Sequence, residues 1–155
     1  MEISLDKLNF AYNDQSVIKE ISCSFKSGNF YSIIGPNGSG KTTLLDLISG
    51  FLKPDSGEIS INQTPISSRS KQEISKKIAV VSQDYAINFP FSVREVVMMG
   101  RHPYVSRFAY PSKEDKQKVD KMMRVCGIRH LENRKINALS GGERQRSVFA
   151  RALCQ

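Results

Sequence analysis

Eight consecutive residues in the first third of the chain match G-x-x-x-x-G-K-[ST], a glycine-rich pattern that binds nucleotide phosphates. With Thr43, the residue that follows the pattern, they read Gly35-Pro36-Asn37-Gly38-Ser39-Gly40-Lys41-Thr42-Thr43. Glycines let backbone amides approach phosphate oxygens without a Cβ in the way, and the following helix directs its positive end at the same charge. This chemistry predicts that Lys41 contacts the β and γ phosphates and that Thr42 places its hydroxyl on Mg²⁺.

A second short motif lies near the end of the sequence. It reads Leu139-Ser140-Gly141-Gly142-Glu143-Arg144-Gln145 and is predicted to open a helix, with Ser140 as its N-cap. The two small residues after Ser140 would leave backbone amides exposed at the positive end of that helix. The motif therefore predicts a second anion site, one without a lysine of its own.

The hydrophobic pattern around these motifs predicts mixed strands and helices first and a helical block afterwards. Strands are predicted over 3–12, 17–25, 29–34, 58–61 and 78–81. Helices are predicted over 40–49, 70–77, 93–100, 141–153 and around the apolar stripe of 119–126, with Ser112 as the cap of the last-named. Met122 and Met123 belong to that stripe and are predicted to fill the core rather than to bind a ligand.

Composition is that of an ordinary globular chain, with 25% charged and 39% hydrophobic residues among 155. No apolar run approaches the ~18 residues that a membrane helix needs, and the first residues lack the features of a signal peptide. Three widely spaced cysteines indicate neither a disulfide framework nor a zinc site. We therefore expect a reducing, cytoplasmic environment.

The net charge of +8 is unevenly distributed. Residues 1–100 carry 10 basic and 10 acidic side chains, whereas residues 101–155 carry 13 basic and 5 acidic ones. A basic block can bind nucleic acid or an anionic membrane surface. Most of these charges lie between residues 111 and 148, where no aromatic residue interleaves with them as base stacking would require, so a solvated helical surface is favoured.

Together, the two glycine motifs resemble those of ATP-binding-cassette (ABC) transporter ATPase subunits, and the resemblance covers the whole chain. It implies an α/β P-loop NTPase fold, with a RecA-like core, an antiparallel β subdomain and a helical subdomain. It also implies that Tyr12 stacks on adenine and that Gln83 contacts Mg²⁺. In such proteins two subunits sandwich ATP, so Ser140, Gly141, Gly142, Glu143 and Gln145 would contact the nucleotide of a partner copy. The implied partners are a second copy, a membrane permease and, indirectly, a substrate-binding protein, at the inner face of the plasma membrane.

The segment from Phe89 to Tyr104 resembles the branch of this family that imports iron–siderophore complexes, haem and cobalamin. One ATP-binding domain is expected over 1–155, with 1–88 as the β subdomain and phosphate-loop half and 89–155 as the helical part. The family pattern continues with an Asp-Glu strand and a switch histidine, which this sequence does not contain. The fold is therefore expected to be incomplete at its C-terminus, and hydrolysis by this chain to be at least ~10²-fold slower than in a complete subunit, because the general base is missing.

Two alternatives stay open at this point. A soluble ABC ATPase acting on DNA or the ribosome would account for the basic block at 101–155, although the stretch between the two motifs is too compact for the long coiled coil of DNA-repair members. A non-catalytic ATP-binding remnant would account for the missing carboxylates. The resemblance favours an importer subunit that binds ATP and Mg²⁺ and does not bind nucleic acid.

Overall fold

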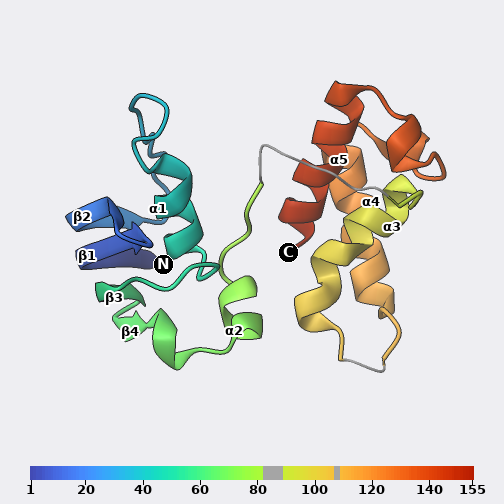
Figure 1. Ribbon diagram of the computed structural model, residues 1–155. Coiled ribbons are helices and arrows are strands. Elements are labelled where there is room, and N and C mark those ends of the chain that lie inside the picture. Colours follow the sequence, from blue (N-terminus) through green and yellow to red (C-terminus); the bar gives the residue numbers. More distant parts are fainter. Residues whose placement is uncertain (82–88, 107–108) are drawn as a thin grey trace. The chain divides into compact units, whose positions relative to one another are not determined.

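The chain folds into two compact units, Met1–Ile74 and Ser75–Gln155, in a computed structural model that describes residues 1–81, 89–106 and 109–155. The first unit, blue to green in Figure 1, combines a sheet with one main helix. The second, yellow to red, is helical. No helix in the described ranges combines the length and the apolar composition that a membrane crossing requires.

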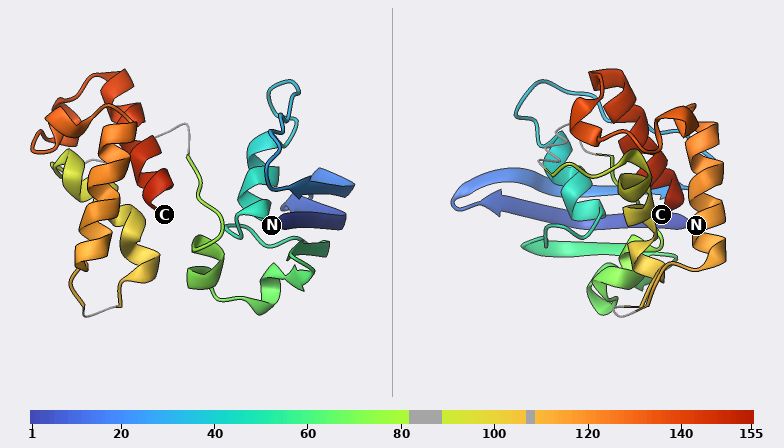
Figure 2. Two further views of the ribbon diagram at one scale, coloured as in Figure 1. Left: turned by 180° about the vertical axis from the view of Figure 1, so that it is seen from behind. Right: turned by 90° about the vertical axis from the view of Figure 1, so that its right-hand side faces the viewer.

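The sheet of the first unit is antiparallel and has the strand order β2-β1-β3-β4. Its strands are β1 (Glu2–Tyr12), β2 (Gln15–Lys26), β3 (Ser56–Ile61) and the short β4 (Thr64–Pro65). The two long strands form a hairpin in which Tyr12 pairs with Gln15, and they run side by side in Figure 2. Leu5, Leu8, Ile59 and Ile61 from this sheet are almost completely buried. Their burial gives the sheet one apolar face.

Helix α1 (Lys41–Ile48) follows the glycine loop and belongs to the same unit. Leu44, Leu47 and Ile48 recur at helical spacing and are buried, so the helix contributes an apolar stripe to the core. Gly50 adopts a left-handed backbone with φ of 72°, which ends the helix as the sequence predicts. A short helix, α2 (Lys71–Ser75), contains the point in the sequence, after Ile74, at which the first unit ends.

The second unit is a bundle in which α3 (Val93–Met98), α4 (Lys113–Val125) and α5 (Gly141–Cys154) contact one another in pairs. Short 3₁₀ turns connect them: η2 (Met99–Tyr104), η3 (Arg129–Leu131) and η4 (Ile136–Ala138). In the first unit η1 (Ile66–Ser68) follows β4. Met123 is fully buried in the core of the bundle and Met122 packs against it, which confirms the prediction that these residues fill the core. The core also contains Val93, Val96, Val97, Val119, Ile128, Leu131, Ile136, Leu139, Ala150 and Cys154.

Two predicted strands are wrong. Residues 29–34 and 78–81 have no strand conformation, and Phe30 and Ile34 are 96% and 89% exposed. A strand requires a neighbouring strand that pairs with its backbone, and within the described ranges no segment pairs with either stretch. The hydrophobic pattern of these residues therefore predicted strands, but within the described ranges neither stretch has a neighbouring strand with which its backbone could pair. The predicted boundary between residues 88 and 89 stays a prediction, because 82–88 lie outside the described residues.

Candidate nucleotide-binding site

The glycine loop leads directly into α1 and changes direction through two left-handed residues. Gly38 has φ of 81° and Gly40, the residue before the helix, has φ of 85°. At Gly40 an added Cβ would lie 3.0 Å from Cγ1 of Val17 and 3.1 Å from Cδ1 of Ile18, both on β2. Glycine is therefore needed here both for the left-handed turn and for the close approach of the loop to the sheet.

Lys41 turns back over the loop from the first position of α1. Its ammonium donates hydrogen bonds to the carbonyl oxygens of Gly35 at 2.9 Å and Pro36 at 2.7 Å, and lies 3.5 Å from Oγ of Ser39. The amide of Ser39 in turn donates to the carbonyl of Pro36, at 3.3 Å. These contacts hold one positive charge at the centre of the loop. A phosphate entering here would meet a cation whose position is already fixed.

The environment of the loop fits an anion. No acidic residue occupies the first turn of α1, so the positive helix end is not neutralised locally. Gly38 faces open space, because nothing lies within 4 Å of an ideal Cβ there. Thr42 is exposed, whereas its neighbour Thr43 is buried at 8% exposure. Of these two residues, Thr42 is the exposed one and so the better candidate to meet a metal ion that accompanies a phosphate chain.

Tyr12 lies at the end of β1 and is 49% exposed. Its ring makes an edge contact with Phe10, with ring centroids 4.9 Å apart. The hairpin end that carries Tyr12 also carries Val17, the residue that lies against Gly40. The hairpin thus supplies an accessible aromatic ring and a packing surface for the phosphate loop from one end of the sheet.

The second motif opens α5 in the helical unit. Ser140 is its N-cap, as predicted: Oγ of Ser140 accepts from the amide of Glu143 at 3.4 Å, while the Glu143 carboxylate accepts from the amide of Ser140 at 2.9 Å. Hydrogen bonds from Ser140 lower the pKa of Glu143. Gly141, Gly142 and Gln145 are exposed. The first amides of a helix have no partner within it, so this end presents free donors to solvent.

The Ser112 and Ser140 caps belong to a pattern that recurs in the chain and also marks the helix starts at Ser70 and Ser92. Ser-x-x-Glu or Ser-x-x-Asp occurs at four helix starts as a reciprocal pair of hydrogen bonds, at Ser70–Glu73, Ser92–Glu95, Ser112–Asp115 and Ser140–Glu143.

The predicted metal contact Gln83 lies outside the described residues. Among the described residues no cluster of three or more His, Cys, Asp or Glu side chains could hold a metal ion.

Fold and loop geometry thus define an α/β unit with an exposed glycine loop before its main helix, joined in sequence to a helical unit whose last helix begins with a second glycine motif. The sequence profile of the ABC transporter family matches residues 18–155, and the chain belongs to that family.

Individual relatives of the chain are also ABC transporter proteins. The chain is 40% identical over 153 residues to the hemin import ATP-binding protein HmuV of Escherichia coli O157:H7, covering 99% of this chain and 57% of that protein. It is 36% identical over 155 residues to the cobalamin import ATP-binding protein BtuD of Halobacterium salinarum, covering 100% of this chain and 38% of that protein. A solved structure described as a metal-chelate type ABC transporter in an inward-facing conformation superposes with a TM-score of 0.82 at 31% identity, covering 98% of this chain and 55% of that one. The chain therefore spans between about two fifths and three fifths of the length of the curated relatives it matches.

Proposed function

We propose that this chain binds ATP with Mg²⁺ through Gly35–Thr43 and acts as the energising subunit of an ABC importer for iron–siderophore complexes, haem or cobalamin. The observation that carries the proposal is the position of Lys41, held by the carbonyls of Gly35 and Pro36 at the centre of an exposed glycine loop. The named functions of relatives such as HmuV and BtuD support the class of cargo. In this role ATP hydrolysis by the complete protein drives transport.

In this proposal the residues of the site bind different parts of ATP–Mg²⁺. Lys41 and the loop amides bind the β and γ phosphates, and the N-terminus of α1 adds its positive partial charge. The hydroxyl of Thr42 and the side chain of Gln83 hold Mg²⁺, which when bound neutralises charge on the phosphate oxygens. Tyr12 stacks on the adenine, a contact worth roughly 1–3 kcal/mol that discriminates only modestly between bases.

The exposed start of α5 acts on a second nucleotide. Ser140, Gly141 and Gly142, with Glu143 and Gln145 in the first turn, contact the phosphates bound by another copy of the chain, so that two copies enclose two ATP molecules. The pair docks on a membrane permease and works with a substrate-binding protein, which places it at the cytoplasmic face of the membrane.

Isothermal calorimetry with ATP–Mg²⁺ tests the nucleotide assignment. Lys41→Ala is expected to weaken binding roughly 10- to 100-fold, since one charge-assisted contact to phosphate is lost. Lys53→Ala removes an exposed lysine from the same unit and should leave the affinity unchanged. Equal affinities of the parent and the Lys41 variant would refute the proposal.

A nucleic-acid role is the competing function, and the charge of the helical unit is the observation that favours it. The exposed basic residues of α4 are Lys113, Lys116, Lys118, Lys121 and Arg124. No aromatic residue lies among them on the helix, so base stacking has no platform. We expect weak DNA binding that moderate salt abolishes, and tight binding that depends on DNA sequence at physiological salt would favour the competing function.

A further inference from the structure

The last turn of α5 rests directly on the backbone of η2. An ideal Cβ on Gly100 would lie 2.2 Å from the carbonyl oxygen of Arg151 and 2.9 Å from Cβ of Cys154. No side chain fits in that space, so only glycine allows η2 to approach the helix this closely. Gly100 belongs to the stretch from Phe89 to Tyr104 that resembles one branch of the family, and nothing in the proposed nucleotide site uses it.

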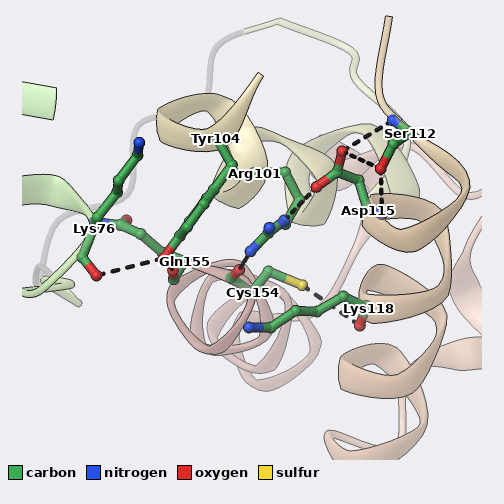
Figure 3. Close-up of polar contacts among 8 residues, drawn as sticks. All are labelled: Lys76, Arg101, Tyr104, Ser112, Asp115, Lys118, Cys154 and Gln155. Atoms are coloured by element: carbon green, nitrogen blue, oxygen red, sulfur yellow. Dashed lines mark hydrogen bonds and ion pairs between the residues drawn. The ribbon is translucent and has the colours of Figure 1, made fainter. Parts of the chain in front are cut away.

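The residue after Gly100 connects three elements. Nε of Arg101 donates to Oδ1 of Asp115 at 2.8 Å, and its terminal nitrogen donates to the carbonyl oxygen of Cys154 at 2.7 Å (Figure 3). Both charged side chains are about nine-tenths buried, with 11% and 10% exposure. Asp115 also accepts hydrogen bonds from Ser112 at the start of α4. Arg101 therefore ties the first turn of α4 to the carbonyl end of α5, where a cation is electrostatically favoured.

Tyr104 extends the same set of contacts. Its ring lies 3.9 Å from the guanidinium carbon of Arg101, and its hydroxyl donates to the carbonyl oxygen of Gln155 at 2.7 Å. The side-chain amide of Gln155 donates to the carbonyls of Ser75 at 2.7 Å and Ile78 at 2.9 Å. The end of α5 is thus joined to the segment that precedes Gln83 in the sequence.

We propose that Gly100, Arg101 and Tyr104 form a clasp on the last turn of α5 and that Arg101 is a positioning residue for Ser140, Gly141 and Gly142 at the opposite end of that helix. The proposal rests on the proposed function, in which those amides contact the nucleotide of a second copy. An α-helix is a stiff rod with a rise of about 1.5 Å per residue, so a shift or rotation at one end of α5 displaces the other. The clasp fixes the axial position of α5 and links it to the segment leading to Gln83.

The same unit contains a matched control. Arg94 also binds carboxylates, Asp120 on α4 at 2.6 Å and Glu132 at 3.0 Å, but none of its hydrogen bonds reaches α5. Arg101→Lys and Arg94→Lys both keep the positive charge and remove a guanidinium from an ion pair with α4. Lysine lacks the planar fork that lets arginine bond two groups at once. A difference between the two variants therefore reports the contact with α5.

Amide hydrogen exchange in the 155-residue chain tests the anchoring without any nucleotide. Arg101→Lys should speed exchange of the α5 amides about tenfold relative to those of α3, because a buried charge-assisted contact is lost, while Arg94→Lys should leave the ratio unchanged. Unchanged α5 exchange in Arg101→Lys, or an equal effect of both variants, would overturn the clasp. If Arg101→Lys does not fold, Tyr104→Phe decides by the same comparison: faster exchange in the last turn of α5 supports the clasp, and unchanged exchange overturns it.

Two measurements test the positioning role of Arg101: the affinity of the chain for ATP and the affinity of two chains for each other in the presence of ATP. Arg101→Lys should keep the calorimetric affinity for ATP within about twofold, since the phosphate loop lies in the other unit, while ATP-driven pairing of two chains, measured by sedimentation, should weaken about tenfold. Arg94→Lys should change neither. Loss of pairing in both variants, or in neither, would overturn the positioning role. Absence of ATP binding by the parent chain would instead refute the proposed function, and the exchange experiment would still decide whether the clasp exists.

Discussion

Gly40 lies directly against Val17: a Cβ at position 40 would approach Cγ1 of Val17 to 3.0 Å. This contact joins the phosphate loop to the hairpin that carries Tyr12. It also makes Gly40 and Gly38 a natural comparison, since both have left-handed backbones but only Gly40 has neighbours within 4 Å of the missing Cβ.

We predict that Gly40→Ala destabilises the chain more than Gly38→Ala does. Both substitutions place a Cβ on a left-handed residue, at a cost of roughly 1–2 kcal/mol. Gly40→Ala additionally forces Val17 and Ile18 to move, which adds roughly 1–3 kcal/mol of overpacking. Urea unfolding of the two variants measures the difference, and equal midpoints would show that the loop does not pack on β2 as described.

Asp115 should make stability depend on pH in the acid range. Hydrogen bonds from Arg101 and Ser112 lower the pKa of Asp115 from 3.8 to about 2 in the folded chain. Because the pKa is lower in the folded chain than in the unfolded chain, the ionised Asp115 carboxylate stabilises the fold. This contribution is fully present above the unfolded pKa and is lost as pH falls from about 4 towards about 2. The shift corresponds to about 2 kcal/mol.

Asp115→Asn tests this contribution. The variant should be less stable than the parent by about 2 kcal/mol near neutral pH, and the difference should shrink as pH falls below about 4, because the parent then loses the same charge. Chemical unfolding at several pH values measures both curves. A difference that stays constant down to about pH 3 would contradict the assigned ion pair.

Ser140→Ala should shorten or fray α5 at its first turn. The variant loses the hydroxyl that accepts from the amide of Glu143, and N-cap replacements of this kind cost about 0.5–2 kcal/mol. Ser24→Ala, at an exposed position on β2, should have no measurable effect. Thermal unfolding compares the two, and exchange of the first α5 amides locates the change. An unaltered first turn would show that Ser140 is not the cap.

Met123→Ala should be among the most damaging single changes in the helical unit. Met123 is fully buried between the helices, and truncating such a side chain leaves a cavity that costs about 2–5 kcal/mol. Val125→Ala, two residues along the same helix at 66% exposure, should stay within about 0.5 kcal/mol of the parent. Similar losses for both variants would mean that α4 packs through a different face.

Much of the local structure follows from the residue pattern alone. The strands at Glu2–Tyr12 and Gln15–Lys26, the helix after the glycine loop, and the Ser112 and Ser140 caps all form where the sequence predicts them. These features depend on alternation, helical spacing and hydrogen bonds within a few residues, which the sequence contains in full. The roles of Tyr12, Gln83 and the residues around Ser140 stay predictions.

The sequence by itself determined the family, the phosphate loop and the positions of most helices, because glycines, capping residues and apolar spacing act over short distances. Only the tertiary structure decided the rest. Residues 29–34 and 78–81 look like strands but form none, since a strand depends on a neighbour that pairs with it. Likewise, Arg101, Asp115 and Cys154 are far apart in the chain, and nothing in the local pattern shows that a buried guanidinium joins them. That contact exists because three helical elements close around one core, and close packing decides which side chains meet.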